Sequence, residues 1–147
     1  MGHIKTTENK MKYRMLTISS NRNNILEVES YLKRLDFDFG FQSEKYADIL
    51  ISLTEAVNNA ITHGNKNDES KKVHIHVREK NNGLAFCVTD EGGGFNPSRV
   101  PDPTCDENIE CCGGRGVYIM KALSDDITFE DDGRSVEMYF NLNNELA

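Results

Sequence analysis

Residues 55–64 read EAVNNAITHG and close the longest helical pattern in the chain. Apolar side chains recur every three or four residues from Tyr46 to Ile61, which predicts a helix that ends with this stretch. At about 100° per residue, Glu55 and Asn59 lie one turn apart on a common side, roughly opposite the apolar stripe. A carboxylate beside an amide can hold Mg²⁺ or position a base next to a metal ligand. The same pair also fits an ordinary solvated helix face, so the helix alone leaves both interpretations open.

Two glycine-rich segments follow farther along the chain. Residues 90–95, DEGGGF, come directly after a predicted strand, and three successive glycines imply positive φ angles or a backbone that passes close to something. Residues 113–116, GGRG, open a predicted helix, where unpaired amides and the helix dipole favour an anion such as phosphate. No Lys-Ser or Lys-Thr follows, so this segment does not match a P-loop.

Periodicity predicts the remaining elements. Helical spacing runs from about residue 24 to residue 35, is interrupted by Gly40, and recurs over 117–123. Strand-like segments cover 13–18, 73–77, 84–88, 127–129 and 135–142, with turns at 81–83 and 131–134. This order predicts an α+β fold, a two-layer sandwich with helices packed on one face of a mostly antiparallel sheet.

Composition restricts the class of protein. The chain has 147 residues with 37% hydrophobic and 28% charged residues, which indicates one soluble globular domain. We see no apolar stretch long enough for a membrane span and no signal-peptide pattern, so we expect a cytoplasmic protein. A net charge of −7 disfavours direct nucleic-acid binding.

Residues 95–112 have neither helical nor strand periodicity and contain all three prolines of the chain. A segment of this length without regular structure suggests a functional lid. It carries four acidic residues and one arginine, a negative charge that is unfavourable beside an anionic ligand. Three explanations remain open: its acidic side chains face solvent, the segment contacts a protein partner, or catalysis is weak. We read its three cysteines, Cys105, Cys111 and Cys112, as free thiols in preference to a zinc site, because no C-x2-C unit is present. His74 and His76 likewise fit the solvent face of a strand better than a metal pair.

The order of the clusters is more specific than any one of them. A helix with Glu-x3-Asn, a strand ending in Asp-x-Gly-x-Gly, a lid, and Gly-x-Gly opening a helix resemble the N, G1 and G2 boxes of the GHKL, or histidine-kinase-like, ATPase superfamily. The forms EAVNNAITHG, DEGGGFNP and GRGVYIM are similar to those of the anti-sigma-factor serine/threonine protein kinases. The resemblance spans about residues 13–142.

This resemblance implies the Bergerat fold, a mixed sheet covered on one face by helices, with ATP held between the helices and the lid. Its implied domain covers residues 12–143 with an ATP lid at 95–112, after a flexible tail at 1–11. Glu55 would be the catalytic general base, and Asn59 would ligate Mg²⁺. Asp90 would accept a hydrogen bond from the adenine amino group, above Gly92 and Gly94.

For the phosphates, the resemblance implies backbone amides from Gly114 and Gly116, and a cation from Arg115 if that side chain points inward. His63 belongs to the first box by residue type, but we interpret it as a hydrogen-bonded histidine near a helix end.

The function implied is an ATP-dependent serine/threonine protein kinase that acts as an anti-sigma factor. It would phosphorylate an STAS-type anti-anti-sigma protein and sequester a sigma factor by partner switching. Homodimerisation is also implied, with the first strand and helix as the expected interface, and neither nucleic acid nor membrane is an expected partner. The alternative is a non-catalytic ATP-binding module that sequesters a regulatory partner without transferring phosphate.

Overall fold

The computed structural model describes residues 15–92 and 114–142. Its helical elements are η1 (Arg22–Asn24), α2 (Ile25–Phe39), α3 (Ser43–Asn59), η2 (Ala60–Gly64), α5 (Gly114–Leu123) and η4 (Asp131–Gly133). Its strands are β1 (Met15–Ser19), β2 (Lys72–Lys80), β3 (Gly83–Thr89), β4 (Asp126–Glu130) and β5 (Ser135–Asn141). The expected tail, the expected lid, Gly94 and the cysteines at 105, 111 and 112 lie outside the described residues.

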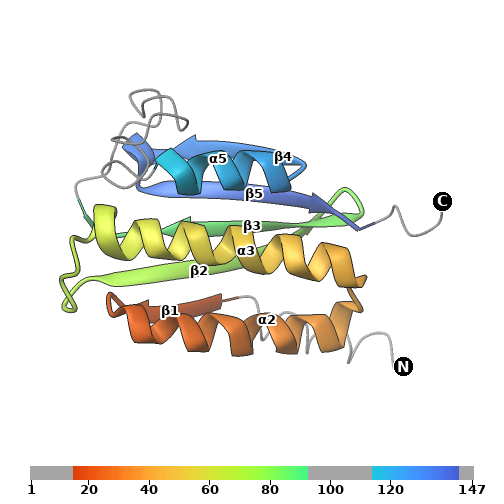
Figure 1. Cartoon of the computed structure of the whole chain (residues 1–147), viewed down its shortest axis with the longest axis horizontal. Coiled ribbons are helices and arrows are strands. Elements are labelled where there is room, and N and C mark those ends of the chain that lie inside the picture. Colours follow the sequence, from red (N-terminus) through yellow and green to blue (C-terminus); the bar gives the residue numbers. More distant parts are fainter. Residues whose placement is uncertain (1–14, 93–113, 143–147) are drawn as a thin grey trace.

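The strands form one sheet in the order β1-β2-β3-β5-β4, and each neighbouring pair is antiparallel. Helices α2, α3 and α5 lie side by side across one face of this sheet (Figure 1). The predicted two-layer α+β sandwich is therefore confirmed. The sheet expected to be mostly antiparallel is antiparallel at each pairing of the described strands.

The core lies between the helices and the sheet. Strand β2 shows why: Val73, Ile75 and Val77 are buried against the helices, while the alternate residues His76 and Arg78 are exposed. From the helix side, the buried residues of α2 are Val28, Tyr31, Leu32 and Leu35, which are four of the positions that the helical spacing identified.

Local signals in the sequence set several element ends. Gly40 follows α2 with a left-handed φ of 67°, and its N–H donates to the Asp36 carbonyl, which caps the helix as the interruption of the pattern predicted. Asn81 and Asn82 turn the β2–β3 hairpin with φ angles of 48° and 63°. The first strand begins at Met15 within the described residues, so the predicted start at residue 13 lies outside them.

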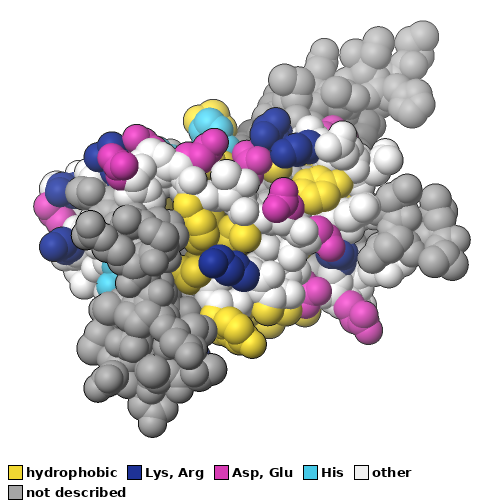
Figure 2. Space-filling model, turned by 90° about the horizontal axis from the view of Figure 1, so that it is seen from above, with side chains coloured by type: hydrophobic (Ala, Val, Ile, Leu, Met, Phe, Trp, Pro, Cys, Tyr) yellow, Lys and Arg dark blue, Asp and Glu magenta, His cyan; other side chains and the backbone are white. Residues whose placement is uncertain are grey.

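Strand β4 forms one edge of the sheet, and its outward residues Asp126 and Glu130 are exposed. Seen from above, acidic and basic side chains are interspersed on this face around a small central group of hydrophobic side chains (Figure 2). Charges on an edge strand discourage pairing with a strand of another chain. Across the described segments, no helix has the length and apolar character needed to cross a membrane.

Candidate functional site

The helix that carries the first motif changes geometry where the motif lies. Residues Ala60–Gly64 form a π-helical turn after α3, and the Asn65 N–H donates to the Ala60 carbonyl at 2.8 Å. Widened turns of this kind are frequent at functional sites. Here the turn brings Gly64 and Asn65 against the end of β3.

Asp90 is the first residue after β3, and it is only 6% exposed. Its Oδ1 accepts a hydrogen bond of 2.8 Å from the Gly92 N–H. A side chain at Gly64 would overlap the Asp90 carboxylate, and one at Gly92 would overlap the Gly64 carbonyl oxygen. Gly92 does not have a positive φ, so its close approach to Gly64 explains why glycine occupies this position. Close approach was one of the two reasons predicted for the glycine run.

The charge state of Asp90 is set by opposing influences. Burial raises the pKa of this carboxyl above its ordinary value, whereas the Gly92 hydrogen bond and the Arg134 guanidinium lower it. A carboxylate in this position is a hydrogen-bond acceptor in a largely dry environment.

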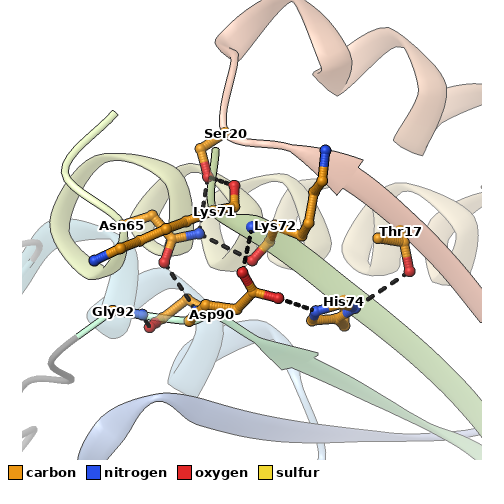
Figure 3. Close-up of polar contacts among 9 residues, drawn as sticks. Thr17, Ser20, Asn65, Lys71, Lys72, His74, Asp90 and Gly92 are labelled. Carbon is orange, nitrogen blue, oxygen red and sulfur yellow. Dashed lines mark hydrogen bonds and ion pairs between the residues drawn. The ribbon is translucent and has the colours of Figure 1, made fainter. Parts of the chain in front are cut away.

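Asn65 fixes the chain around Asp90 (Figure 3). It is 1% exposed, and its Nδ2 donates to the Ser20 Oγ at 2.8 Å and to the Lys72 carbonyl at 2.9 Å. Its Oδ1 accepts from the Glu91 N–H at 2.9 Å. One buried amide thus joins the end of β1, the start of β2 and the residue after Asp90. Asn65 was not identified from the sequence, although it directly follows the first motif.

A second set of bonds extends this network over the open face of the sheet. The Glu91 carboxylate accepts from the Lys72 N–H at 2.9 Å and lies 2.8 Å from the His74 Nε2. The other ring nitrogen of His74 is 3.2 Å from the Thr17 Oγ1 on β1. Within the described part of the chain, no group of three or more His, Cys, Asp or Glu side chains could hold a metal ion.

Glu55 and Asn59 share one side of α3 and meet the first turn of α5. A Cβ built on Gly116 would lie 2.9 Å from the Asn59 Nδ2 and 3.0 Å from the Glu55 Oε1. Both side chains are half-buried, so this side of α3 is not the open solvated face that we considered from the sequence. Among the residues that the structure describes, the buried Asn59 Nδ2 finds no hydrogen-bond partner. An unpaired donor next to a helix start favours a ligand that accepts hydrogen bonds, such as an anion.

A narrow pocket of about 20 Å³, partly open to solvent, lies where the end of α3, the end of β3 and the β4–β5 turn meet. Asn59, Asp90 and Arg134 contribute its polar lining. The apolar lining comes from Ala56, Ala60, Val88, Met120, Phe129 and Val136. An apolar pocket with a few convergent polar groups is the usual form of a small-molecule site. Arg134 was not identified from the sequence, because its segment was interpreted only as a turn.

The structure also shows where the remaining predicted site residues lie, as far as they fall within the described ranges. Gly114 begins α5, and Arg115 in its first turn is exposed. His63 lies in the π-helical turn, half-buried, and burial lowers the pKa of its imidazole.

Comparison with known proteins agrees with this geometry. The family model described as "Histidine kinase-like ATPase domain" matches residues 18–140. The chain is 30% identical to the serine-protein kinase RsbW of Bacillus subtilis over 115 residues, which are 72% of this chain and 71% of that protein. It is 29% identical to the anti-sigma F factor of Clostridium perfringens over 143 residues, 92% of this chain and 99% of that one.

The match over most of the chain defines the class: a histidine-kinase-like ATPase domain, which implies ATP binding. Within that class, the chain belongs to the anti-sigma-factor kinase family. The resemblance identified from the three motifs is thereby confirmed.

Proposed function

We propose that this protein is an ATP-dependent serine/threonine protein kinase and anti-sigma factor. The observation that carries the proposal is the convergence of Asp90 and Asn59 on one pocket, with Glu55 and Gly116 beside Asn59. The names of the relatives, a serine-protein kinase and an anti-sigma F factor, support the same activity.

At the base end of the pocket, Asp90 would accept a hydrogen bond from the adenine amino group. This end also has a steric role. Because Gly64 and Gly92 carry no side chains and pack closely at Asp90, a flat base can rest against the backbone there. Gly94 would extend this passage, as the resemblance implies.

At the phosphate end, the first turn of α5 would offer the amides of Gly114 and Gly116, with Arg115 as an additional cation. Asn59 fits a Mg²⁺ ligand, because its side-chain oxygen is of the type that this ion prefers and the Glu55 carboxylate lies next to the same Gly116 backbone. When bound, Mg²⁺ supplies positive charge beside the phosphates.

Glu55 would act as the general base, because it is adjacent to Asn59 on the same side of α3. Its carboxylate would accept the proton of a serine or threonine hydroxyl as that oxygen attacks the terminal phosphorus of ATP. The bond between this phosphorus and the bridging oxygen breaks, and ADP leaves.

By resemblance, the protein substrate would be an STAS-type anti-anti-sigma protein, and the protein would sequester a sigma factor once that substrate is phosphorylated. The functional unit would be residues 12–143, with residues 95–112 as the ATP lid, and it would act as a homodimer in the cytoplasm.

The test is a transfer assay with Mg-ATP and an STAS-domain protein encoded beside this chain, read by mass spectrometry for phosphoserine or phosphothreonine. Glu55→Gln should slow transfer by about 10²–10⁴-fold and leave ATP affinity nearly unchanged. Glu44→Gln, in the exposed first turn of the same helix, is the matched control and should transfer at the normal rate. Normal transfer by Glu55→Gln would refute the base assignment.

The alternative function is a non-catalytic ATP-binding module that holds a regulatory partner. Tight ATP binding by the unmodified protein without any phosphopeptide would favour this alternative.

A further inference from the structure

The turn between β4 and β5 has an unusual backbone. Asp131, Asp132 and Gly133 have consecutive φ angles of 57°, 57° and 83°, in the left-handed region that non-glycine residues rarely adopt. The Arg134 N–H donates to the Asp131 carbonyl at 3.1 Å and closes this turn. Such backbone conformations persist where the surrounding structure holds them, often at ligand sites.

The turn brings Arg134 to both ends of the Asp90–Gly92 segment. Its carbonyl oxygen accepts from the Asp90 N–H at 2.9 Å, and its Nη1 lies 3.5 Å from the Gly92 carbonyl oxygen. Its Nη2 donates to the Asp131 Oδ1 at 3.0 Å. Arg134 also lines the pocket, so the guanidinium is held at the base end by contacts with its own turn and with the Asp90 loop.

The charged groups that act on Asp90 come from two segments of the chain, the β4–β5 turn and the residues before β2. The β4–β5 turn contributes Arg134, which favours the ionised carboxylate, and Asp131, which disfavours it. Lys71, before β2, also favours ionisation. From η2 the neighbour is Gly64, followed by the uncharged amide of Asn65, and preceded by His63, whose pKa burial lowers.

We propose that Arg134 is a positioning residue for base selectivity: it keeps Asp90 an obligate hydrogen-bond acceptor, and so makes the pocket prefer adenine over guanine nucleotides. This inference rests on the proposed function, since it assigns Asp90 to the base. An ionised carboxylate can only accept, which suits the 6-amino group of adenine. A protonated carboxyl can also donate, which suits the 6-oxo group of guanine. The charge of Arg134 therefore decides between the two bases through Asp90.

The first experiment needs no nucleotide. The carboxyl carbon of Asp90 is titrated by NMR in the full chain and in three variants. Arg134→Gln should raise the titration midpoint by about one pH unit, whereas Arg134→Lys, which keeps the charge, should stay near the unmodified protein. Asp131→Asn should move the midpoint in the opposite direction, because it removes a negative charge and asparagine tolerates the left-handed conformation.

Arg78→Gln is the matched control. Arg78 also forms an ion pair with a carboxylate, Glu137, but on the open face of the sheet. It should leave the midpoint of Asp90 unchanged. An unshifted midpoint in Arg134→Gln would overturn the inference. If Arg134→Gln does not fold, an unshifted midpoint in Asp131→Asn would overturn it.

The second experiment measures ADP and GDP affinity by calorimetry between pH 5 and pH 8. In Arg134→Gln, the preference for ADP should fall at a pH about one unit higher than in the unmodified protein. If the unmodified protein binds ADP and Arg134→Gln keeps the same selectivity at every pH, the inference is wrong and the proposed function stands. If the unmodified protein binds no ADP, the proposed function itself fails. Loss of selectivity in Arg134→Lys with an unshifted midpoint would assign Arg134 a direct contact with the base and would also overturn the inference.

Discussion

The two ends of the pocket differ in how far the protein completes them. At the proposed base end, the Asp90 Oδ1, the Glu91 N–H and the side chain of Asn65 have hydrogen-bond partners within the protein. At the proposed phosphate end, the buried Asn59 Nδ2 has no such partner among the described residues, and the backbone of Gly116 lies beside Glu55 and Asn59.

This difference indicates a division of roles. A base end that internal hydrogen bonds already hold in place contributes selectivity at little cost in ordering. The phosphate end keeps an unsatisfied donor, which costs stability in the free protein and is relieved only when a ligand supplies an acceptor. The predictions below test this contrast.

The largest effect is expected at Gly92. Gly92→Ala would push a Cβ into the carbonyl oxygen of Gly64, the last residue of the π-helical turn. We expect a loss of about 3 kcal/mol in the free energy of unfolding, measured in urea, together with loss of ADP binding. Gly40→Ala is the control, because Gly40 has a positive φ but no atom within 4 Å of the added carbon, and should cost only about 1 kcal/mol. Equal losses in the two variants would show that the base end is not tightly packed.

A smaller loss is expected at Asn65. Asn65→Ala leaves the Lys72 carbonyl and the Glu91 N–H without their side-chain partner, which should cost about 2 kcal/mol of unfolding free energy. ADP affinity should also decrease, because Asp90 directly precedes Glu91. Asn23→Ala, at an exposed site in η1, should change stability by less than about 0.5 kcal/mol. Unchanged ADP affinity in Asn65→Ala would contradict a pre-organised base end.

At Asn59 we expect a small gain in the free energy of unfolding, in contrast to the losses at Gly92 and Asn65. Asn59→Ala removes the buried donor without a partner and introduces a better helix former, so the free protein should gain up to about 1 kcal/mol. The same variant should lose the dependence of ATP affinity on Mg²⁺, measured by calorimetry with and without the ion. Asn58→Ala should keep that dependence. A destabilised Asn59→Ala protein would mean that the phosphate end is also complete without ligand.

The smallest effect is expected at Glu91. The Lys72 N–H, and then His74, lower the pKa of this carboxyl, so its contribution to stability is present above the ordinary pKa of glutamate and is lost as pH falls through the lowered value. Glu91→Gln should therefore be slightly less stable than the unmodified protein at pH 7. The difference should fade below about pH 4. Glu69→Gln, in the exposed loop before β2, should show no such convergence, and thermal melts across pH distinguish the two.

Much of the fold could be predicted from the sequence, because its signals are local. The alternation of Val73, Ile75 and Val77 with polar residues identified β2, and the spacing of α2 identified its buried face. The site could be predicted less completely. Glu55, Asn59, Asp90 and Gly92 were proposed as candidates from motifs, whereas Asn65 and Arg134 were missed because their contacts are with residues distant in the chain.

The sequence by itself determined the order of elements, the faces that are buried and the family, since these follow from periodicity and from three short motifs. Only the tertiary structure decided that Gly64 and Gly92 pack against Asp90 and its loop, that α5 covers Glu55 and Asn59, and that the β4–β5 turn brings Arg134 to the base end. The physical reason is that hydrogen bonds and close contacts between residues distant in the chain depend on how the elements pack, and no local pattern encodes that packing.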